Sequence, residues 1–174
     1  MSTAGGNRSG IGWDSHRLEP GRRLVLGGVE IEESEVGLAG HSDADVLTHA
    51  VIDALLGAAG MGDIGQHFPD SDERWRDADS IALLSEVVAL AGRAGWTVGN
   101  VDATVICEAP KLAPHRDPMR ATLAAALGIA SDAVNVKFTT NERMGPIGRG
   151  EGIAALATAT VRPAGGAPAG RVDS

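Results

Sequence analysis

The stretch SDADVLTHAVIDALLGAAG, residues 42–60, predicts a helix that carries both core and functional residues. Ser42 or Asp43 is suited to cap its first turn. Asp45 and His49 are four residues apart and share one helical face, which turns His49 back toward the loop that precedes the helix. The apolar residues recur at helical spacing, at Val46, Leu47, Ala50, Val51, Ala54 and Leu55, and a glycine-rich turn follows them.

Outward from this helix, strand and helix patterns alternate along the chain. Before it, residues 10–18 and 22–31 predict two strands that pair with each other, the second one broken by two glycines. After it, residues 61–79 show neither period and contain several acidic residues, which indicates a long functional loop. Beyond the loop, the pattern predicts a helix capped by Ser80, a strand over 97–106, a helix over 114–127 and strands over 134–138 and 153–161.

This order of elements predicts a two-layer α/β (α+β) fold. We expect an open mixed sheet of four strands plus a small hairpin, with the helices on one face of the sheet. The other face must bury its apolar residues, for which Ala154, Leu156 and Ala157 are candidates. Self-association is the simplest way to cover that face.

Length and composition limit the classes of function. With 174 residues the chain is long enough for one domain, and we expect a folded part over residues 10–163 between flexible tails at 1–9 and 164–174. The net charge of −8 argues against a surface for nucleic acid or anionic membranes. The single cysteine, Cys107, excludes an internal disulfide and favours a reducing compartment, so we expect the cytoplasm. We expect neither a signal peptide nor a membrane-spanning segment.

The run Asp14-Ser15-His16 predicts half of a metal site. Side chains two positions apart on a strand point to the same face, so Asp14 and His16 converge while Ser15 turns away. With His49, one carboxylate and two imidazoles would hold an ion and leave a fourth position open, as catalytic zinc sites do. For any single histidine, the alternative is a buried, hydrogen-bonded imidazole that binds no metal.

Two glycine-rich segments bear on phosphate binding. The Gly-x-Gly at residues 10–12 lacks the third glycine of a dinucleotide fingerprint, and no helix begins there, so we reject that interpretation. Residues 145–152 directly follow the run TTNE at 139–142. Hydroxyls, exposed amides and Arg149 suit phosphate oxygens, so we expect a second functional loop here; a plain flexible hairpin is the alternative.

Seven short motifs occur in order along the chain: GWDSH at 12–16, GHSDAD at 40–45 followed by His49, GDIG at 62–65, FPDSD at 68–72, APK at 109–111, TTNE at 139–142 and GRGEG at 148–152. Together they resemble the 2-C-methyl-D-erythritol 2,4-cyclodiphosphate synthase family. The resemblance spans nearly all of the predicted folded part. Agreement among several ordered motifs is far more specific than any one of them.

The resemblance implies an enzyme, a phosphorus–oxygen lyase of the non-mevalonate route to isoprenoid precursors. Its substrate would be 4-diphosphocytidyl-2-C-methyl-D-erythritol 2-phosphate, and its products 2-C-methyl-D-erythritol 2,4-cyclodiphosphate and CMP. The resemblance also implies a homotrimer whose sheets pack around the trimer axis, with active sites between adjacent subunits. The implied cofactors are one zinc-type cation per site, and Mg²⁺ or Mn²⁺ bound with the substrate diphosphate.

The resemblance also assigns site residues, motif by motif. The zinc-type ligands of the family fall on Asp14, His16 and His49, and Glu142 matches the position that helps to hold Mg²⁺ or Mn²⁺. The transition-state positions fall on His41 and Thr140. The substrate-binding positions fall on Asp14, Ser15, His16, His41, Ser42, Asp63, Ile64, Gly65, Phe68, Pro69, Asp70, Ser71, Asp72, Cys107, Glu108, Ala109, Pro110, Lys111, Leu112, Ala113, Thr139, Thr140, Asn141, Glu142, Pro146 and Arg149.

Each group of these residues has an expected partner. Asp63 and the amides of the next two residues would face the hydroxyls of the polyol, because carboxylates accept from hydroxyl donors. Residues 68–72 would line the same cavity. Residues 107–113 would form the cytosine pocket, with Cys107 as a wall of that pocket and not a nucleophile. Because Pro146-Ile147 stand where the family commonly carries Phe-Thr beside a channel on the trimer axis, the sequence leaves open whether that channel binds an isoprenoid diphosphate.

The chemistry agrees with this assignment, and two alternatives remain. The attacking phosphate is already anionic, so no catalytic triad is required, and none is apparent. The first alternative is a metal-dependent phosphohydrolase, in which the open metal position would carry hydroxide. The second is a trimeric metal-binding scaffold with a closed structural site.

Overall fold

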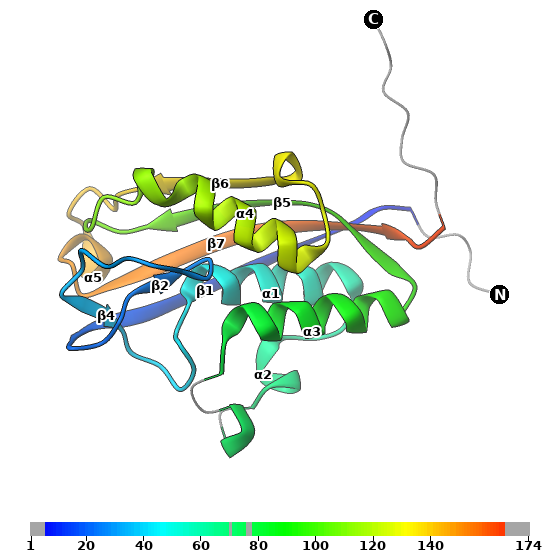
Figure 1. The fold of residues 1–174 in the computed structure, drawn as a ribbon, viewed down its shortest axis with the longest axis horizontal. Coiled ribbons are helices and arrows are strands. Elements are labelled where there is room, and N and C mark those ends of the chain that lie inside the picture. Colours follow the sequence, from blue (N-terminus) through cyan, green and yellow to red (C-terminus); the bar gives the residue numbers. More distant parts are fainter. Residues whose placement is uncertain (1–5, 70, 76–77, 166–174) are drawn as a thin grey trace, which may run out of the picture.

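A mixed five-stranded sheet forms one layer of the fold and helices form the other (Figure 1). The computed structural model describes residues 6–69, 71–75 and 78–165. The strands of the sheet are β1 (Arg8–Pro20), β4 (Val36–Leu38), β5 (Trp96–Ile106), β6 (Val134–Thr139) and β7 (Gly152–Pro163). Their order is β4-β1-β7-β5-β6, and neighbours are antiparallel except for the parallel pair β5 and β6.

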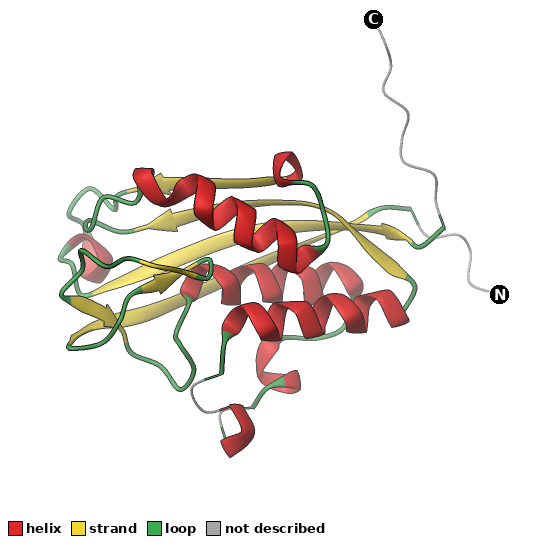
Figure 2. Cartoon of the chain, in the orientation of Figure 1, coloured by secondary structure: helices red, strands yellow, loops and turns green. Residues whose placement is uncertain are grey.

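Three long helices lie on one face of the sheet (Figure 2): α1 (Val46–Ala59), α3 (Ser80–Arg93) and α4 (Arg116–Leu127). This two-layer arrangement confirms the predicted fold class. The connections contain two short helices, α2 (Ile64–His67) and α5 (Gly145–Gly148), the 3₁₀ turns Glu73–Trp75, Ala113–His115 and Ser131–Ala133, and a separate hairpin of β2 (Val25–Leu26) and β3 (Val29–Glu30).

The helix α1 occupies the centre of the core. Eleven of its 14 residues are buried. It packs against β1 and β7 on one side and against α3 on another. A helix enclosed in this way is apolar on nearly all sides, which accounts for the dense run of Val, Leu, Ile and Ala in this segment.

Two glycines allow β1 and α1 to approach closely. A Cβ atom at Gly12 would come within 2.0 Å of the carbonyl oxygen of Ala50, and one at Gly10 within 2.1 Å of the carbonyl oxygen of Ala54. No other residue fits at these two positions without moving the helix. The residues that follow on the same face of β1, Asp14 and His16, therefore lie directly against the first turns of α1.

The predicted pairing of residues 10–18 with residues 22–31 is wrong. Gly27 and Gly28 adopt φ angles of +59° and +71°, a conformation that closes a tight two-residue turn, so β2 pairs with β3. The strand β1 pairs instead with β4 and β7. The sheet therefore has a fifth strand beyond the predicted four. That strand, β4, is three residues long and lies in a segment that the sequence analysis read as loop, since so short a run shows no alternation.

The predicted helix caps are also wrong, by two or three residues for α1 and by one residue for α3. Asp45 caps α1 and Asp79 caps α3, each by accepting a hydrogen bond from an amide of the first turn. Ser42 and Asp43 are engaged elsewhere: the Ser42 hydroxyl accepts from a nearby backbone amide, and the Asp43 carboxylate accepts from the amide of Ser80. Several capping-type residues stand in a row in both segments, so composition alone does not select the one that caps.

The face of the sheet opposite α1 exposes large apolar side chains. Ile11 and Trp13 alternate with Gly10 and Gly12 along β1 and are 67% and 56% exposed. None of the described helices has the length and apolar character that spanning a membrane requires. The strand β1 begins at Arg8, two residues before the predicted start of the folded part. The predicted C-terminal tail lies, except for its first two residues, outside the described residues.

Candidate metal centre and active site

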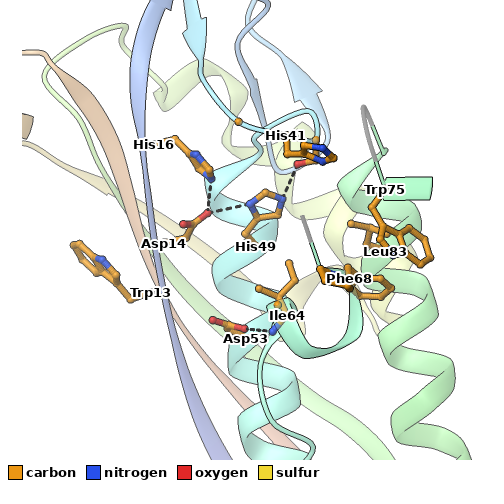
Figure 3. A pocket seen from close by; sticks show the side chains of 14 residues that line it. Trp13, Asp14, His16, His41, His49, Asp53, Ile64, Phe68, Trp75 and Leu83 are labelled. Atoms are coloured by element: carbon orange, nitrogen blue, oxygen red, sulfur yellow. Dashed lines mark hydrogen bonds and ion pairs between the residues drawn. The ribbon is translucent and has the colours of Figure 1, made fainter. Parts of the chain in front are cut away.

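Asp14, His16 and His49 converge as predicted (Figure 3). The Oδ2 atom of Asp14 lies 2.9 Å from Nε2 of His16 and 2.9 Å from Nδ1 of His49. One ligand atom from each of the three lies within 4.8 Å of the others. Among the residues that the structure describes, this is the only cluster of three such side chains with that spacing.

The convergence follows from the local structure of two elements. Asp14 and His16 are two positions apart on β1, so both point toward α1, while the exposed Ser15 points to the other face. His49 lies in the first turn of α1, and the glycines of β1 bring that turn against the strand. The expected orientation of His49 toward the preceding loop holds in part, because its Nε2 atom lies 3.3 Å from the Ser42 hydroxyl.

The electrostatics of the cluster suit a cation. Burial would raise the pKa of the Asp14 carboxyl, but hydrogen bonds and charges from His16 and His49 outweigh burial and hold that pKa well below its usual range. Asp14 is therefore ionised at neutral pH. The Nδ1 atom of His16 lies 2.8 Å from the carbonyl oxygen of Ala39, which leaves Nε2 to face the cluster. A carboxylate and two oriented imidazoles are consistent with one divalent cation.

The cluster opens into a cavity of about 420 Å³. Its wall brings together residues from β1, α1, the loop at 40–42 and the segment around α2. Nine of the predicted site residues line it: Asp14, His16, His41, Ser42, His49, Ile64, Gly65, Phe68 and Pro69; Trp13, Gly40, Asp53, Trp75 and Leu83 complete the wall.

Asp53 is a cavity residue that the sequence analysis missed. Its Oδ1 atom accepts a hydrogen bond of 2.8 Å from the amide of Ile64, the first residue of α2 (Figure 3). Its Oδ2 atom bonds to no donor in the part of the chain that the structure describes. Burial, with the charges of nearby carboxylates, raises the pKa of Asp53. The signal was present, because Asp53 follows His49 by one helical turn and so lies on the same face of α1.

A second cavity, of about 230 Å³, lies at the ends of β5 and β6. Burial raises the pKa of the Cys107 thiol to about 11, so this side chain is protonated at neutral pH. The predicted site residues that line this cavity are Cys107, Glu108, Pro110, Lys111, Leu112, Ala113, Thr139 and Thr140, and Phe138 joins them. Ala109 lies between lining residues. The two cavities share no residue.

The segment that follows β6 is held in one shape by Glu108. Its Oε1 atom accepts from the amides of Asn141 and Arg143, at 2.9 Å and 3.2 Å. Glu142, at a left-handed φ of +51°, accepts a hydrogen bond of 2.9 Å from the Thr140 hydroxyl. Glu142 does not line the cavity of the metal cluster within the described structure.

Other predicted site residues lie outside both cavities. Asp63 caps α2, and both its oxygens accept from Gln66. Asp72 forms an exposed ion pair with Arg74. Asp70 lies outside the described residues. The remaining ones line neither cavity: Ser15, Ser71, Asn141, Pro146 and Arg149, of which Pro146 is the second residue of α5 and Arg149 pairs with Glu151.

Fold and site together define a class: a mixed α/β protein with an Asp-His-His cluster, consistent with a divalent cation, in one cavity and a second cavity at the ends of two parallel strands. Within that class, the chain belongs to the YgbB family, which matches residues 7–162. The resemblance noted in the sequence is thereby confirmed.

Relatives with names agree with this family. A protein of Thermosynechococcus vestitus named 2-C-methyl-D-erythritol 2,4-cyclodiphosphate synthase is 57% identical over 155 residues, which cover 89% of this chain and 96% of that protein. A protein of the same name from Salinibacter ruber is 58% identical over 157 residues, covering 90% and 99%. A solved structure described as IspF of Plasmodium falciparum in complex with CDP superposes with a TM-score of 0.80 at 32% identity, covering 94% of this chain and 99% of that one.

Proposed function

We propose that this chain converts 4-diphosphocytidyl-2-C-methyl-D-erythritol 2-phosphate into 2-C-methyl-D-erythritol 2,4-cyclodiphosphate and CMP. The observation that carries the proposal is the convergence of Asp14, His16 and His49 at the wall of a cavity. Relatives that are 57% and 58% identical over most of the chain are named for this product. The reaction belongs to the non-mevalonate route to isoprenoid precursors.

The reaction is an intramolecular phosphoryl transfer. An oxygen of the 2-phosphate attacks the β-phosphorus of the diphosphate and forms a new P–O bond. The bond from the β-phosphorus to the bridging oxygen breaks, and CMP leaves with that electron pair. Because the nucleophile is already anionic, the protein must mainly position two mutually repelling phosphates and neutralise their charge.

The charge is neutralised by two cations and nearby side chains. Asp14, His16 and His49 would hold a zinc-type ion, which would supply Lewis-acid polarisation of the β-phosphate. Glu142, a hard oxygen ligand, would help to hold Mg²⁺ or Mn²⁺, which would neutralise charge on the diphosphate. The hydrogen bond from Thr140 to Glu142 orients that carboxylate. His41, at the wall of the first cavity, and Thr140 stabilise the transition state.

The substrate occupies both cavities. The methylerythritol phosphate part fits the cavity of about 420 Å³, where Gly65 presents its amide and Phe68 and Pro69 form a wall. The Ile64 amide, expected from the sequence to face the polyol as well, is already bonded to Asp53. Asp63, Ser71 and Asp72 lie outside the wall of this cavity and are assigned to the substrate from the family resemblance, as is Asp70, which lies outside the described residues. The cytosine fits the smaller cavity, which is lined by all residues from 107 to 113 except Ala109. A neutral, buried Cys107 suits the wall of such a pocket. Ser15, Asn141, Pro146 and Arg149 contact the substrate between the two.

The enzyme acts as a homotrimer. Within one chain the two cavities share no residue, so one substrate that fills both favours a site shared between adjacent subunits. Exposed Ile11 and Trp13 give the open face of the sheet the apolar character that an interface would bury. Sedimentation analysis tests this assignment: three-chain particles are expected, and a monomer at micromolar concentration would contradict it.

The cytoplasm is the proposed compartment. The chain has one cysteine, and the structure records it as a free, buried thiol. A chain with a free thiol and no disulfide suits a reducing compartment. Fractionation of cells that express the protein is expected to recover it with cytoplasmic markers.

One experiment tests the reaction class. The purified protein is incubated with the cytidine diphosphate substrate and Mg²⁺ in ¹⁸O-labelled water, and CMP and the cyclic product are followed together. Equal amounts of CMP and cyclic diphosphate, without ¹⁸O in either, are expected. Incorporation of ¹⁸O into the phosphate products would show a phosphohydrolase, and absence of CMP would leave only a metal-binding scaffold.

A second experiment tests Glu142. The exchange Glu142→Gln is expected to abolish CMP release and leave the trimer intact, because an amide is a poor ligand for Mg²⁺. Glu86→Gln is the matched control, since Glu86 is an exposed residue of α3 that lines neither cavity. Unchanged CMP release in Glu142→Gln would remove Glu142 from the mechanism.

A further inference from the structure

The fully buried hydroxyl of Ser80 lies between His49 and a second carboxylate, that of Asp43. The Ser80 Oγ atom is 2.9 Å from Nε2 of His49. On its other side, the Ser80 hydroxyl donates to the Oδ1 atom of Asp43. The Oδ2 atom of Asp43 accepts from the Ser80 amide at 2.9 Å. Ser80 is the first residue of α3 and is 0% exposed. From the sequence, Ser80 and Asp43 were assigned no role beyond capping a helix.

We propose that Ser80 and Asp43 are positioning residues for the metal centre, which hold the proton of His49 on Nε2 and thereby keep Nδ1 free to bind the metal. This proposal rests on the metal assignment of the proposed function. It concerns the ring orientation of one ligand and not the chemistry of the substrate.

The direction of each hydrogen bond follows from the chemistry of the groups. Only the Nδ1 atom of His49 faces Asp14, so it is the nitrogen placed to bind a metal, and as a ligand it carries no proton. The proton of the neutral ring is then on Nε2, which donates to the Ser80 oxygen. A hydroxyl that accepts one bond still has its own hydrogen to donate, and the Asp43 carboxylate accepts it. With a metal ion bound to Nδ1, every group in this series of hydrogen bonds is satisfied in this one arrangement.

The two imidazoles of the centre are oriented by different means. For His16, the acceptor is a backbone carbonyl, that of Ala39 at 2.8 Å, and no side-chain exchange removes it. For His49, the acceptors are side chains: Ser80 at 2.9 Å and, less closely, Ser42 at 3.3 Å. The orientation of His49 is therefore open to test by mutation. It also ties the metal centre to the start of α3, the element that follows the long loop.

Metal affinity without substrate is the first test. Partners of metal-bound histidines typically contribute 10- to 100-fold in affinity, so Ser80→Ala is expected to weaken zinc binding by about 10-fold or more in competition with a chromogenic chelator. Ser85→Ala is the matched control, an exposed serine on the same helix whose hydroxyl donates to the Ile81 carbonyl. The control should bind zinc like the parent protein.

The outcomes separate the two proposals. If Ser80→Ala keeps the helical content of the parent by circular dichroism and binds zinc within two-fold of Ser85→Ala, the positioning role is overturned while the metal site stands. If the parent protein itself binds no zinc at equimolar concentration, the metal assignment is overturned and the positioning role with it.

A measurement on the unmutated protein covers the case in which Ser80→Ala does not fold. Zinc-loaded protein with ¹⁵N-labelled histidine is expected to show His49 with a protonated Nε2 and a metal-bound Nδ1. The Nε2 proton should exchange slowly with water, because it is bonded to a buried hydroxyl. A His49 signal with the proton on Nδ1, or an Nε2 proton in fast exchange, would overturn the proposal.

Discussion

Asp14 and His49 are 35 residues apart in the sequence, and their Oδ2 and Nδ1 atoms meet at 2.9 Å. The contact joins a strand to the first turn of a buried helix. It exists only because glycine occupies the strand positions that face the helix. The Asp-His-His cluster is therefore a product of close strand–helix packing as much as of the residue types in it.

His49→Ala is expected to lose the bound transition metal, because one carboxylate and one imidazole remain where three ligands are needed. Metal content after gel filtration, measured by inductively coupled plasma mass spectrometry, checks this. His115→Ala serves as the matched control. His115 pairs with Glu33 at a distance of 2.7 Å, and it lines neither cavity. Full metal occupancy in His49→Ala would refute the ligand set.

Gly12→Ala is expected to destabilise the protein and the metal centre together. The new Cβ atom would lie 2.0 Å from a backbone oxygen, which cannot rotate away, so α1 must move. Overpacking of this kind typically costs up to about 3 kcal/mol in the free energy of unfolding. Urea denaturation and zinc affinity measure the two effects.

Gly92→Ala is the control for that prediction. Gly92 lies within α3, and a Cβ atom there would meet nothing within 4 Å. Alanine is the better helix former, so this variant is expected to gain about 0.5–1 kcal/mol. Equal stability of Gly12→Ala and the parent would show that the strand and helix have room to part.

Asp45→Ala is expected to lower the free energy of unfolding by about 3 kcal/mol. The variant would lose the helix cap, and it would leave two backbone amides without an acceptor. The buried Asp45 carboxylate caps α1 and also accepts from the amides of Gly27 and Gly28, at 2.9 Å and 2.7 Å. Asp79→Ala removes a cap alone and is expected to cost about 1 kcal/mol. Thermal or urea unfolding that gives equal losses would contradict the second role of Asp45.

Asp53→Ala is expected to raise KM for the diphosphate substrate by about 5- to 10-fold, the value of one lost hydrogen bond. Without the Asp53 acceptor, the Ile64 amide no longer holds the start of α2 against the cavity. Asp53→Asn keeps an oxygen that accepts from this amide and should lie closer to the parent. Steady-state kinetics check both variants, and an unchanged KM in Asp53→Ala would remove Asp53 from the substrate site.

The pKa of Cys107 sets two pH effects. Because burial raises this pKa from 9.0 to about 11, the thiolate fraction at pH 8 is about 100-fold below that of an ordinary thiol, and alkylation by iodoacetamide should be slow by that factor. The folded state favours the neutral thiol, so this contribution to stability is present below pH 9 and is lost as pH rises toward 11. The single cysteine makes mass spectrometry of the alkylated protein unambiguous. Alkylation as fast as in urea would contradict burial.

Patterns with a short period were readable from the chain. Alternation along β1 placed Asp14 and His16 on one face, and helical spacing placed His49 on the same element as the core residues, so the ligand cluster was predictable. The fold class followed from the order of strands and helices. Asp53 was missed although it obeys the same rule, because a lone aspartate on a helix has no distinctive pattern.

Features that depend on contacts between residues far apart in the sequence could not be predicted from the sequence. The partner of β1 was misassigned, since β7 lies far away in sequence and β2 closes on β3 through two glycines in left-handed conformations. The sequence predicted Ser80 as a helix cap, whereas in the structure its hydroxyl lies within hydrogen-bond distance of His49. Which of several adjacent polar residues caps a helix depends on what the others contact.

Local chemistry and periodicity were thus sufficient to predict the two-layer class and the convergence of Asp14, His16 and His49. The distance between them, the cavity they face and the hydroxyl behind His49 depend on how closely β1 and α1 pack. Packing is decided by contacts among residues remote in sequence, here by two glycines on a strand and by Asp43 ahead of a helix.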